Sequence, residues 1–131
     1  MAGRSRILIA EDDFALANVV RFNLEQAGYH VTWARNGQEA WRAVQSVRFE
    51  LVVSDQEMPQ LTGVELCRRI RGEQSTAPIP VILLTAKSFE FDEETIAELK
   101  LSALLPKPFS PRELVALVDR CLEKNVVPQA L

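Results

Sequence analysis

Side chains that could do chemistry stand at the ends of short apolar runs in this sequence. Carboxylates follow two of the runs, and a threonine and a lysine follow two others: Glu11, Asp12, Asp13, Asp55, Thr85 and Lys107. Short apolar runs with β-branched residues favour buried strands. Because the carboxyl ends of parallel strands lie at one edge of an open α/β sheet, where ligands bind, we expect these side chains to converge.

A cluster of carboxylates at one sheet edge should raise the pKa values of its members unless a cation is present. All-oxygen ligands suit a hard divalent ion, and Mg²⁺ typically takes one or two carboxylates together with waters and phosphate oxygens. Asp55 is then available as a nucleophile that forms an aspartyl phosphate. Transfer requires neutralisation of the charge on the equatorial phosphoryl oxygens, which Mg²⁺, the Lys107 ammonium and the Thr85 hydroxyl could share.

Each of these residues also has a plainer interpretation. A threonine at a strand end is usually only a β-branched strand residue, and a lysine before proline is usually a loop charge. An aspartate that precedes a helix is more often a helix cap than a metal ligand. The joint placement of these residues at successive strand ends is what favours phosphoryl transfer over an ordinary surface.

Strand and helix patterns alternate along the chain. Five segments are predicted strands: 6–10, 29–34, 51–54, 80–84 and 103–105. Apolar residues at helical spacing predict five helices: 14–27, 40–47, 63–72, 90–101 and 111–122. Strands that are apolar on both faces belong in a parallel sheet covered by helices on each side, with right-handed crossovers. The predicted fold is therefore an α/β three-layer sandwich, in which the thin apolar stripe of 90–101 should make that helix the least tightly packed.

Length, charge and the amino-terminal segment limit the classes of function that are open to this chain. A chain of 131 residues is expected to form one domain, and its net charge of −3 argues against a nucleic-acid-binding surface. The basic residues Arg68, Arg69 and Arg71 are interpreted as solvated helix surface. The apolar run 7–10 is too short for a signal peptide or a membrane span, so we expect a cytoplasmic protein without membrane attachment.

The cysteines and the histidine do not suggest a redox or zinc site. Cys67 and Cys121 stand alone at apolar-facing positions of predicted helices, so they are expected to be core thiols. His30 is the only histidine and lies at the start of a predicted strand. Neither histidine-based catalysis nor zinc binding is expected.

Four segments give the chain a clear resemblance to the receiver domains of two-component response regulators, over about residues 5–124. They are Ile7-Leu8-Ile9-Ala10-Glu11-Asp12-Asp13, Ser54-Asp55-Gln56-Glu57-Met58-Pro59, Pro80-Val81-Ile82-Leu83-Leu84-Thr85-Ala86 and Lys107-Pro108-Phe109. The resemblance implies a flavodoxin-like fold with strand order 2-1-3-4-5. It also implies a single receiver domain of the chemotaxis type over 1–131, with 125–131 as a tail or the start of a linker.

The resemblance assigns a role to each residue of the predicted site. Asp55 would accept phosphate from a histidine kinase or a histidine phosphotransfer protein. Mg²⁺ would be bound by Asp12, Asp55 and the backbone carbonyl of Glu57, with Glu11 supporting it through water. Thr85 would move toward the phosphoryl group, Lys107 would pair with it, and the small Ala86 would leave it open to water. The domain would catalyse only its own phosphorylation and dephosphorylation, and the Lys107–Pro108 bond would be cis.

Some positions depart from the family pattern. Leu104 stands where the family usually has the aromatic switch residue, so an aromatic rotamer switch cannot operate in its usual form. Lys100 replaces a common glycine, and Thr62 replaces a common aspartate. Glu57 and Lys87 should flank the site mouth beside Ala86, where we expect them either to pair and hinder the attacking water or to point into solvent.

Two other functions compete with a phosphorylation-switched signalling module. A degenerate receiver would bind partners constitutively, and a phosphatase of the haloacid dehalogenase type would use Asp55 as nucleophile. The phosphatase would want a second aspartate two residues later, which Glu57 matches only in part, and a cap domain. By resemblance, the face formed by helix four, strand five and helix five would bind a downstream protein or output domain, and a homodimer stays open.

Overall fold

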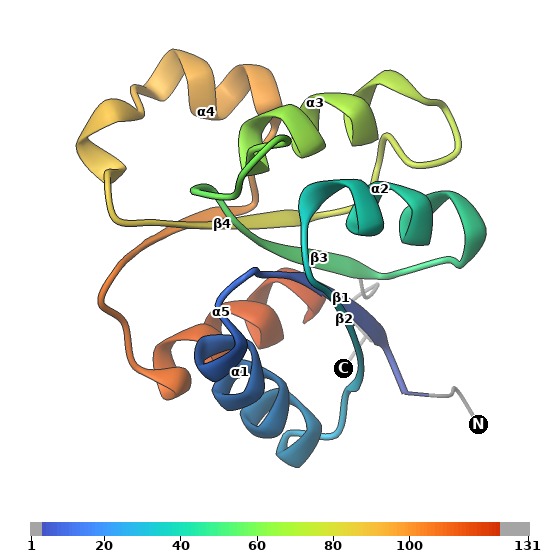
Figure 1. Cartoon of the computed structure of the whole chain (residues 1–131), viewed down its shortest axis with the longest axis vertical. Helices are drawn as coiled ribbons and strands as arrows, with labels where there is room; N and C mark the ends of the chain where they lie inside the picture. Colours follow the sequence, from blue (N-terminus) through green and yellow to red (C-terminus); the bar gives the residue numbers. More distant parts are fainter. Residues whose placement is uncertain (1–3, 124–131) are drawn as a thin grey trace, which may run out of the picture.

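A parallel sheet of five strands runs through the middle of the molecule (Figure 1). The computed structural model describes residues 4–123. Its strands are β1 (Arg6–Ala10), β2 (His30–Ala34), β3 (Leu51–Asp55), β4 (Val81–Thr85) and β5 (Ala103–Pro106). They lie in the order β2-β1-β3-β4-β5, and each pairing is parallel. The predicted strand order is confirmed.

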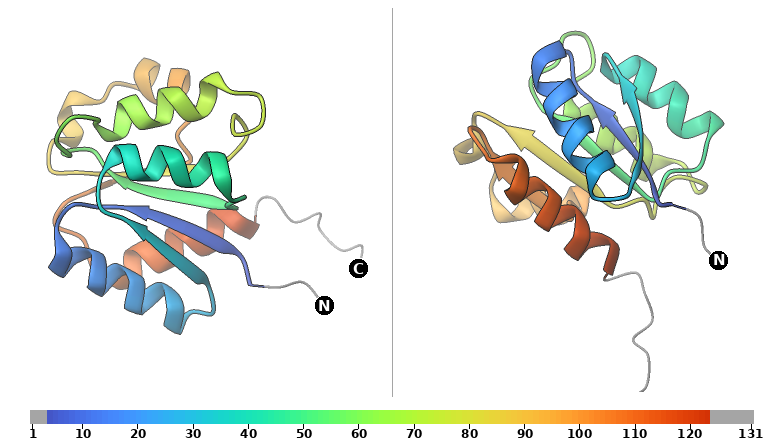
Figure 2. Two further views of the ribbon diagram at one scale, coloured as in Figure 1. Left: turned by 45° about the vertical axis from the view of Figure 1, so that its right-hand side comes forward. Right: turned by 90° about the horizontal axis from the view of Figure 1, so that it is seen from below.

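Helices cover both faces of the sheet, which confirms the three-layer sandwich (Figure 2). The helices are α1 (Phe14–Gln26), α2 (Gly37–Ser46), α3 (Gly63–Gly72), α4 (Glu93–Leu99) and α5 (Pro111–Glu123). A short 3₁₀ turn, η1 (Ser88–Glu90), precedes α4. Helices α1 and α5 lie on one face, and α2, α3 and α4 lie on the other (Figure 1). Within residues 4–123, every helix is too short or too polar to cross a membrane.

The side chains of each strand alternate between two separate hydrophobic layers. In β1, Ile7 and Ile9 pack with residues of α1 and α5, whereas Leu8 and Ala10 pack with residues of α2 and α3. This alternation follows from the two-residue period of a strand, and it explains why strands covered on both faces are apolar throughout. Cys67 and Cys121 are both buried, one in each layer, as predicted.

Side-chain caps start the helices soon after the strands end. The capping residues whose side-chain oxygens accept a backbone N–H three residues later are Asp13, Asn36, Thr62, Asp92 and Ser110. Caps of this kind satisfy N–H groups that have no partner inside the helix. Gly28, with φ of 100°, follows the end of α1 as expected of a helix stop. The Lys107–Pro108 bond is cis, as the resemblance implied.

The predicted helix over 90–101 is shorter than expected. The Asp92 cap starts α4 at Glu93, and Lys100 ends it in the left-handed conformation with φ of 52°. Only Leu99 of this helix is buried, whereas each of the other α-helices buries at least three residues. The expectation that this helix is the least tightly packed is confirmed.

The interpretation of the basic cluster as solvated surface is wrong for Arg71. Its half-buried guanidinium donates hydrogen bonds of 2.8 Å and 2.6 Å to the carbonyl oxygens of Ala77 and Ile79. It also donates to the carbonyl oxygens of Leu99 at 2.8 Å and Lys100 at 3.1 Å. Arg71 therefore connects α3 to the loop before β4 and to the carboxyl end of α4. Arg68 is exposed, as predicted, and lies 3.8 Å from Glu98.

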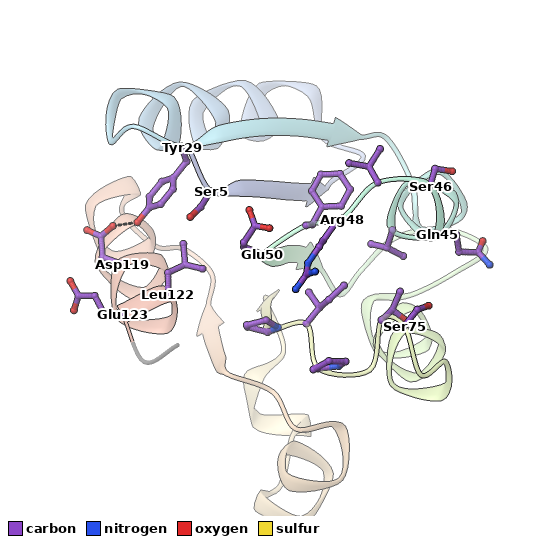
Figure 3. Close-up of a pocket in the computed structure, with 17 residues that line it drawn as sticks. Ser5, Tyr29, Gln45, Ser46, Arg48, Glu50, Ser75, Asp119, Leu122 and Glu123 are labelled. Carbon is purple, nitrogen blue, oxygen red and sulfur yellow. Dashed lines mark hydrogen bonds between the residues drawn. The ribbon is translucent and has the colours of Figure 1, made fainter. Parts of the chain in front are cut away.

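The edge of the sheet at the amino-terminal ends of the strands carries a groove of about 820 Å³ (Figure 3). Ser5, Tyr29 and Pro80, which directly precede strands, line it together with the last turns of α5. Tyr29 donates a hydrogen bond to the carboxylate of Asp119 at one side of the groove. The groove lies at the opposite edge of the sheet from the predicted site, so it is not part of that site.

We predict that Arg71→Met lowers the free energy of unfolding by on the order of 2 kcal/mol, because part-buried carbonyl oxygens lose a charged donor. Arg71→Lys should lose nearly as much, since an ammonium cannot reach all four oxygens. Urea denaturation measures both changes. The control is Arg68→Met, which removes an exposed ion pair and should change stability by less than about 1 kcal/mol. Equal losses at positions 68 and 71 would contradict the role of Arg71.

Candidate functional site

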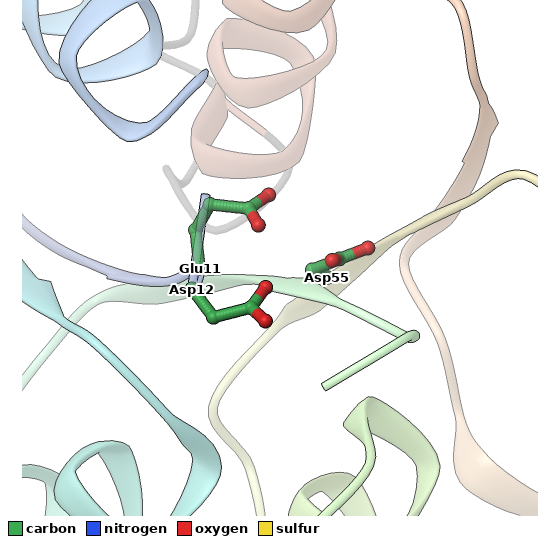
Figure 4. Close-up of side chains that lie close together, drawn as sticks. All are labelled: Glu11, Asp12 and Asp55. Atoms are coloured by element: carbon green, nitrogen blue, oxygen red, sulfur yellow. The ribbon is translucent and has the colours of Figure 1, made fainter. Parts of the chain in front are cut away.

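Pairing of β1 with β3 places three carboxylates together. Ala10 of β1 is the register partner of Ser54 of β3, so Glu11 and Asp55 follow side by side at the carboxyl end of the sheet. Glu11, Asp12 and Asp55 each offer an oxygen atom, and these atoms all lie within 4.8 Å of one another. Figure 4 shows the three side chains turned toward a common space. The predicted convergence of these residues is confirmed, whereas Asp13 serves as the cap of α1.

Burial makes this carboxylate cluster electrostatically unusual. Glu11 and Asp55 are 1% and 2% exposed, whereas Asp12 is exposed. Burial, together with the charge of Asp55, raises the pKa of Glu11 to about 8, although the backbone N–H of Asp13 donates to its carboxylate at 3.0 Å. The pKa of Glu11 is raised, as expected for a member of the cluster, but burial is the largest cause and the charge of Asp55 a smaller one.

Lys107 supplies the positive charge of the cluster. Its Nζ lies 2.8 Å from Asp55 Oδ1 and 4.0 Å from Glu11 Oε1. The pair with Asp55 is an ionic contact, because that carboxylate oxygen accepts no hydrogen bond of regular geometry. Burial lowers the pKa of Lys107, but the nearby carboxylates, Asp55 foremost, outweigh burial and raise it. Lys107 reaches the site because its backbone N–H donates to the carbonyl of Thr85 at 2.8 Å, which extends the β4–β5 pairing past Pro106.

Thr85, at the end of β4, is fully buried and hydrogen-bonded to Glu57. Its hydroxyl donates to Glu57 Oε2 at 2.6 Å, and the backbone N–H of Ala86 donates to Glu57 Oε1 at 3.0 Å. The same hydroxyl accepts the backbone N–H of Lys87 at 3.0 Å. Sequence reasoning placed Glu57 at the site mouth but missed this contact with Thr85.

The expected ion pair between Glu57 and Lys87 is not formed among the described residues. The carboxylate of Glu57 is turned to Thr85 and Ala86 instead, because a hydroxyl and a backbone N–H lie closer to it than the flexible lysine side chain. Both Lys87 and Ala86 are exposed, consistent with a position at the mouth of the site. Leu104 lies in β5 opposite Leu83 and is half-buried, so it is close to the sheet end but not part of the acidic cluster.

The donor set fits a hard divalent cation. The candidate ligand atoms of Glu11, Asp12 and Asp55 are all carboxylate oxygens, a type that Mg²⁺ prefers. Glu11 Oε1 is buried and accepts no hydrogen bond from any described residue, which is costly for a carboxylate unless a cation or water compensates. An ion held by Asp12 and Asp55, with Glu11 behind them, would relieve this deficit.

A family model described as a response regulator receiver domain matches residues 7–119. The chain belongs to this family. The receiver domain is 35% identical over 122 residues to the alkaline phosphatase synthesis transcriptional regulatory protein PhoP of Bacillus subtilis, covering 93% of this chain and 50% of that protein. This chain spans about half the length of the curated relatives it matches.

Solved receiver domains share the fold closely. The chemotaxis response regulator CheY4 of Vibrio cholerae superposes with a TM-score of 0.83 at 28% identity, covering 91% of this chain and 99% of that one. The receiver domain of the sensor histidine kinase PA1611 from Pseudomonas aeruginosa, solved with a magnesium ion coordinated in the active site cleft, gives 0.82 at 30% identity, covering 93% and 99%. The flavodoxin-like receiver fold expected from the resemblance is therefore confirmed.

We predict that the receiver domain, freed of divalent cations, loses stability as the pH rises from about 5 toward 8. The folded-state pKa of Glu11 is raised, so the protonated carboxyl of Glu11 contributes to stability. This contribution is fully present below the unfolded-state pKa and is lost as the pH rises through about 8. Glu11→Gln cannot ionise and keeps an acceptor for the Asp13 N–H. Relative to the wild type, this variant should gain at least about 1 kcal/mol across this pH range.

Urea denaturation in EDTA at several pH values measures this difference. Glu25→Gln, at an exposed position of α1, is the control and should follow the wild-type curve. Parallel curves for Glu11→Gln and the wild type would show that Glu11 does not titrate in this range.

Proposed function

We propose that this receiver domain accepts a phosphoryl group on Asp55 in a Mg²⁺-dependent reaction and signals through the resulting change at its surface. The observation that carries the proposal is the position of Asp55, buried at the end of β3 beside two further carboxylates and 2.8 Å from Lys107 Nζ. A nucleophilic carboxylate, an acidic metal site and a fixed cation are the groups that aspartyl phosphorylation requires.

Asp55 acts as the nucleophile in this scheme. An oxygen of its ionised carboxylate forms a bond to phosphorus as the bond from phosphorus to the donor's leaving atom breaks, and the leaving group keeps that electron pair. A carboxylate nucleophile, unlike a hydroxyl, needs no base to remove a proton before attack. Lys107 Nζ is placed to neutralise one phosphoryl oxygen, and the Thr85 hydroxyl to donate to another once it leaves Glu57.

Mg²⁺, when bound, would neutralise charge on the phosphoryl group and screen it from the carboxylates. Asp12 and Asp55 would hold the ion with the backbone carbonyl of Glu57, and Glu11 would act through water. The receiver domain of PA1611, solved with a magnesium ion coordinated in its active site cleft, supports the choice of Mg²⁺ as the ion. Hydrolysis of the aspartyl phosphate would be limited to the domain's own phosphoryl group.

Receiver domains are signalling domains that interact with histidine kinases and downstream effectors. For this chain we propose a histidine kinase or histidine phosphotransfer protein as the phosphoryl donor. We propose α4, β5 and α5 as the face that binds a downstream protein or an output domain, which the single buried residue of α4 supports. The cytoplasmic location, the homodimer and the switch role of Leu104 stay predictions.

The proposal predicts that incubation with acetyl phosphate and Mg²⁺ adds the mass of one phosphoryl group to the intact protein. Asp55→Asn should abolish this adduct, because an amide is a poor nucleophile at phosphorus. Asp92→Asn is the matched control, since asparagine also caps helices and position 92 is exposed. Omission of Mg²⁺ should also prevent the reaction in the wild type.

The same experiment separates the competing functions. A wild-type protein without an adduct would favour the degenerate receiver, and an adduct that survives in Asp55→Asn would place the phosphoryl group elsewhere. Turnover of unrelated phosphate esters would favour the phosphatase.

A further inference from the structure

The carboxylate of Glu57 is bound to two hydrogen-bond donors at the carboxyl end of β4. These donors are the Thr85 hydroxyl, at 2.6 Å, and the backbone N–H of Ala86, at 3.0 Å. The two contacts use both oxygens of the carboxylate, so it binds the donor pair in a bidentate manner. Charge-assisted hydrogen bonds of this length are about twice as strong as neutral ones.

Both donors are fully used by this contact. A hydroxyl has one hydrogen to donate, and the hydroxyl of Thr85 gives it to Glu57 while accepting the N–H of Lys87. The backbone N–H of Ala86 likewise has a single hydrogen. A second anion that approached β4 could therefore gain neither donor without displacing the carboxylate of Glu57.

The donor pair lies beside the proposed phosphoryl site. Asp55 of β3 is the register partner of Leu84, the residue before Thr85, so the ends of the two strands are adjacent. The negative charge of Glu57 is also one of those that raise the pKa of Lys107, which places Glu57 within the electrostatic reach of the site's cation. A phosphoryl group is, like a carboxylate, an anion with oxygen acceptors.

We infer that Glu57 is an internal competitor of the phosphoryl group: its carboxylate occupies the Thr85 and Ala86 donors in the unphosphorylated domain and must leave them when Asp55 is modified. This inference rests on the proposed function of Asp55. Glu57 is thus a positioning residue that holds Thr85 away from the phosphoryl group and weakens the site for phosphoryl-like anions. The exchange of one anion for the other would couple the chemistry at Asp55 to the backbone that follows β4.

The side chain of Glu57 is exposed, so its replacement should leave the fold intact. The test is a titration of the Mg²⁺-loaded protein with beryllium fluoride, followed by the amide resonance of Ala86 in ¹⁵N–¹H spectra. Glu57→Ala removes the competitor and should bind beryllium fluoride roughly tenfold more tightly than the wild type. Glu57→Gln keeps one oxygen acceptor without the charge and should fall between the two.

Two further variants separate competition from a general charge effect. Glu90→Ala removes an exposed negative charge from η1, in the β4–α4 connection that also carries Ala86, and it should change the affinity for beryllium fluoride by less than about threefold. In a Thr85→Val background, Glu57→Ala should raise the affinity for beryllium fluoride by less, because Glu57 no longer has the Thr85 hydroxyl to accept from. The Ala86 amide of unliganded Glu57→Ala should also exchange with solvent faster than in the wild type, since its acceptor is gone.

The outcomes are distinct. The inference would be overturned if Glu57→Ala and the wild type bound beryllium fluoride with equal affinity. It would also be overturned if Glu57→Ala and Glu90→Ala raised this affinity equally. Neither outcome would affect the role of Asp55. An undiminished gain in the Thr85→Val background would overturn the inference as well. Failure of the wild type and all variants to bind, together with no phosphoryl adduct at Asp55, would overturn the proposed function and this inference with it.

Discussion

The attraction between Lys107 and Asp55 is the interaction on which the site depends. Two carboxylates with almost no exposure lie side by side at one edge of the sheet, where solvent cannot screen their repulsion. A single ammonium, 2.8 Å from one carboxylate and 4.0 Å from the other, offsets part of that repulsion. The cluster still holds more carboxylates than cations, an arrangement that would suit a divalent cation. Burial is the largest cause of the raised pKa of Glu11, and the charge of Asp55 adds to it.

The parts of the fold that follow from short-range rules were predictable from the sequence. Buried parallel strands show as apolar runs, and their carboxyl ends meet at one edge whatever the side chains do. The convergence of Glu11 with Asp55 therefore needed only the location of two strands, because the pairing of Ala10 with Ser54 fixes the rest. Helix starts could be predicted equally well, since a cap such as Thr62 or Ser110 accepts a hydrogen bond from a backbone N–H three residues later.

Contacts that depend on a choice among partners were not predictable. Arg71 looked like its exposed neighbour Arg68, and only the packing of α3 against the end of α4 brings four carbonyl oxygens within its reach. Glu57 was expected to flank the site mouth with Lys87, and Thr85 was expected at the end of its strand. The opposite charge favoured Lys87, whereas the structure favours Thr85 and the Ala86 N–H, which the sheet holds in place without loss of side-chain entropy.

The unequal attachment of α4 has a mechanical consequence. Its carboxyl end carries its one buried side chain, Leu99, and the carbonyl oxygens that Arg71 holds, whereas its amino end follows the exposed segment that begins after Thr85. A helix of this length is about 10 Å long and behaves as a rigid rod. A shift of the segment between Ala86 and Asp92 would therefore rotate α4 about its anchored carboxyl end at Leu99. The outer surface of the helix would then swing most at the end nearest the acidic cluster.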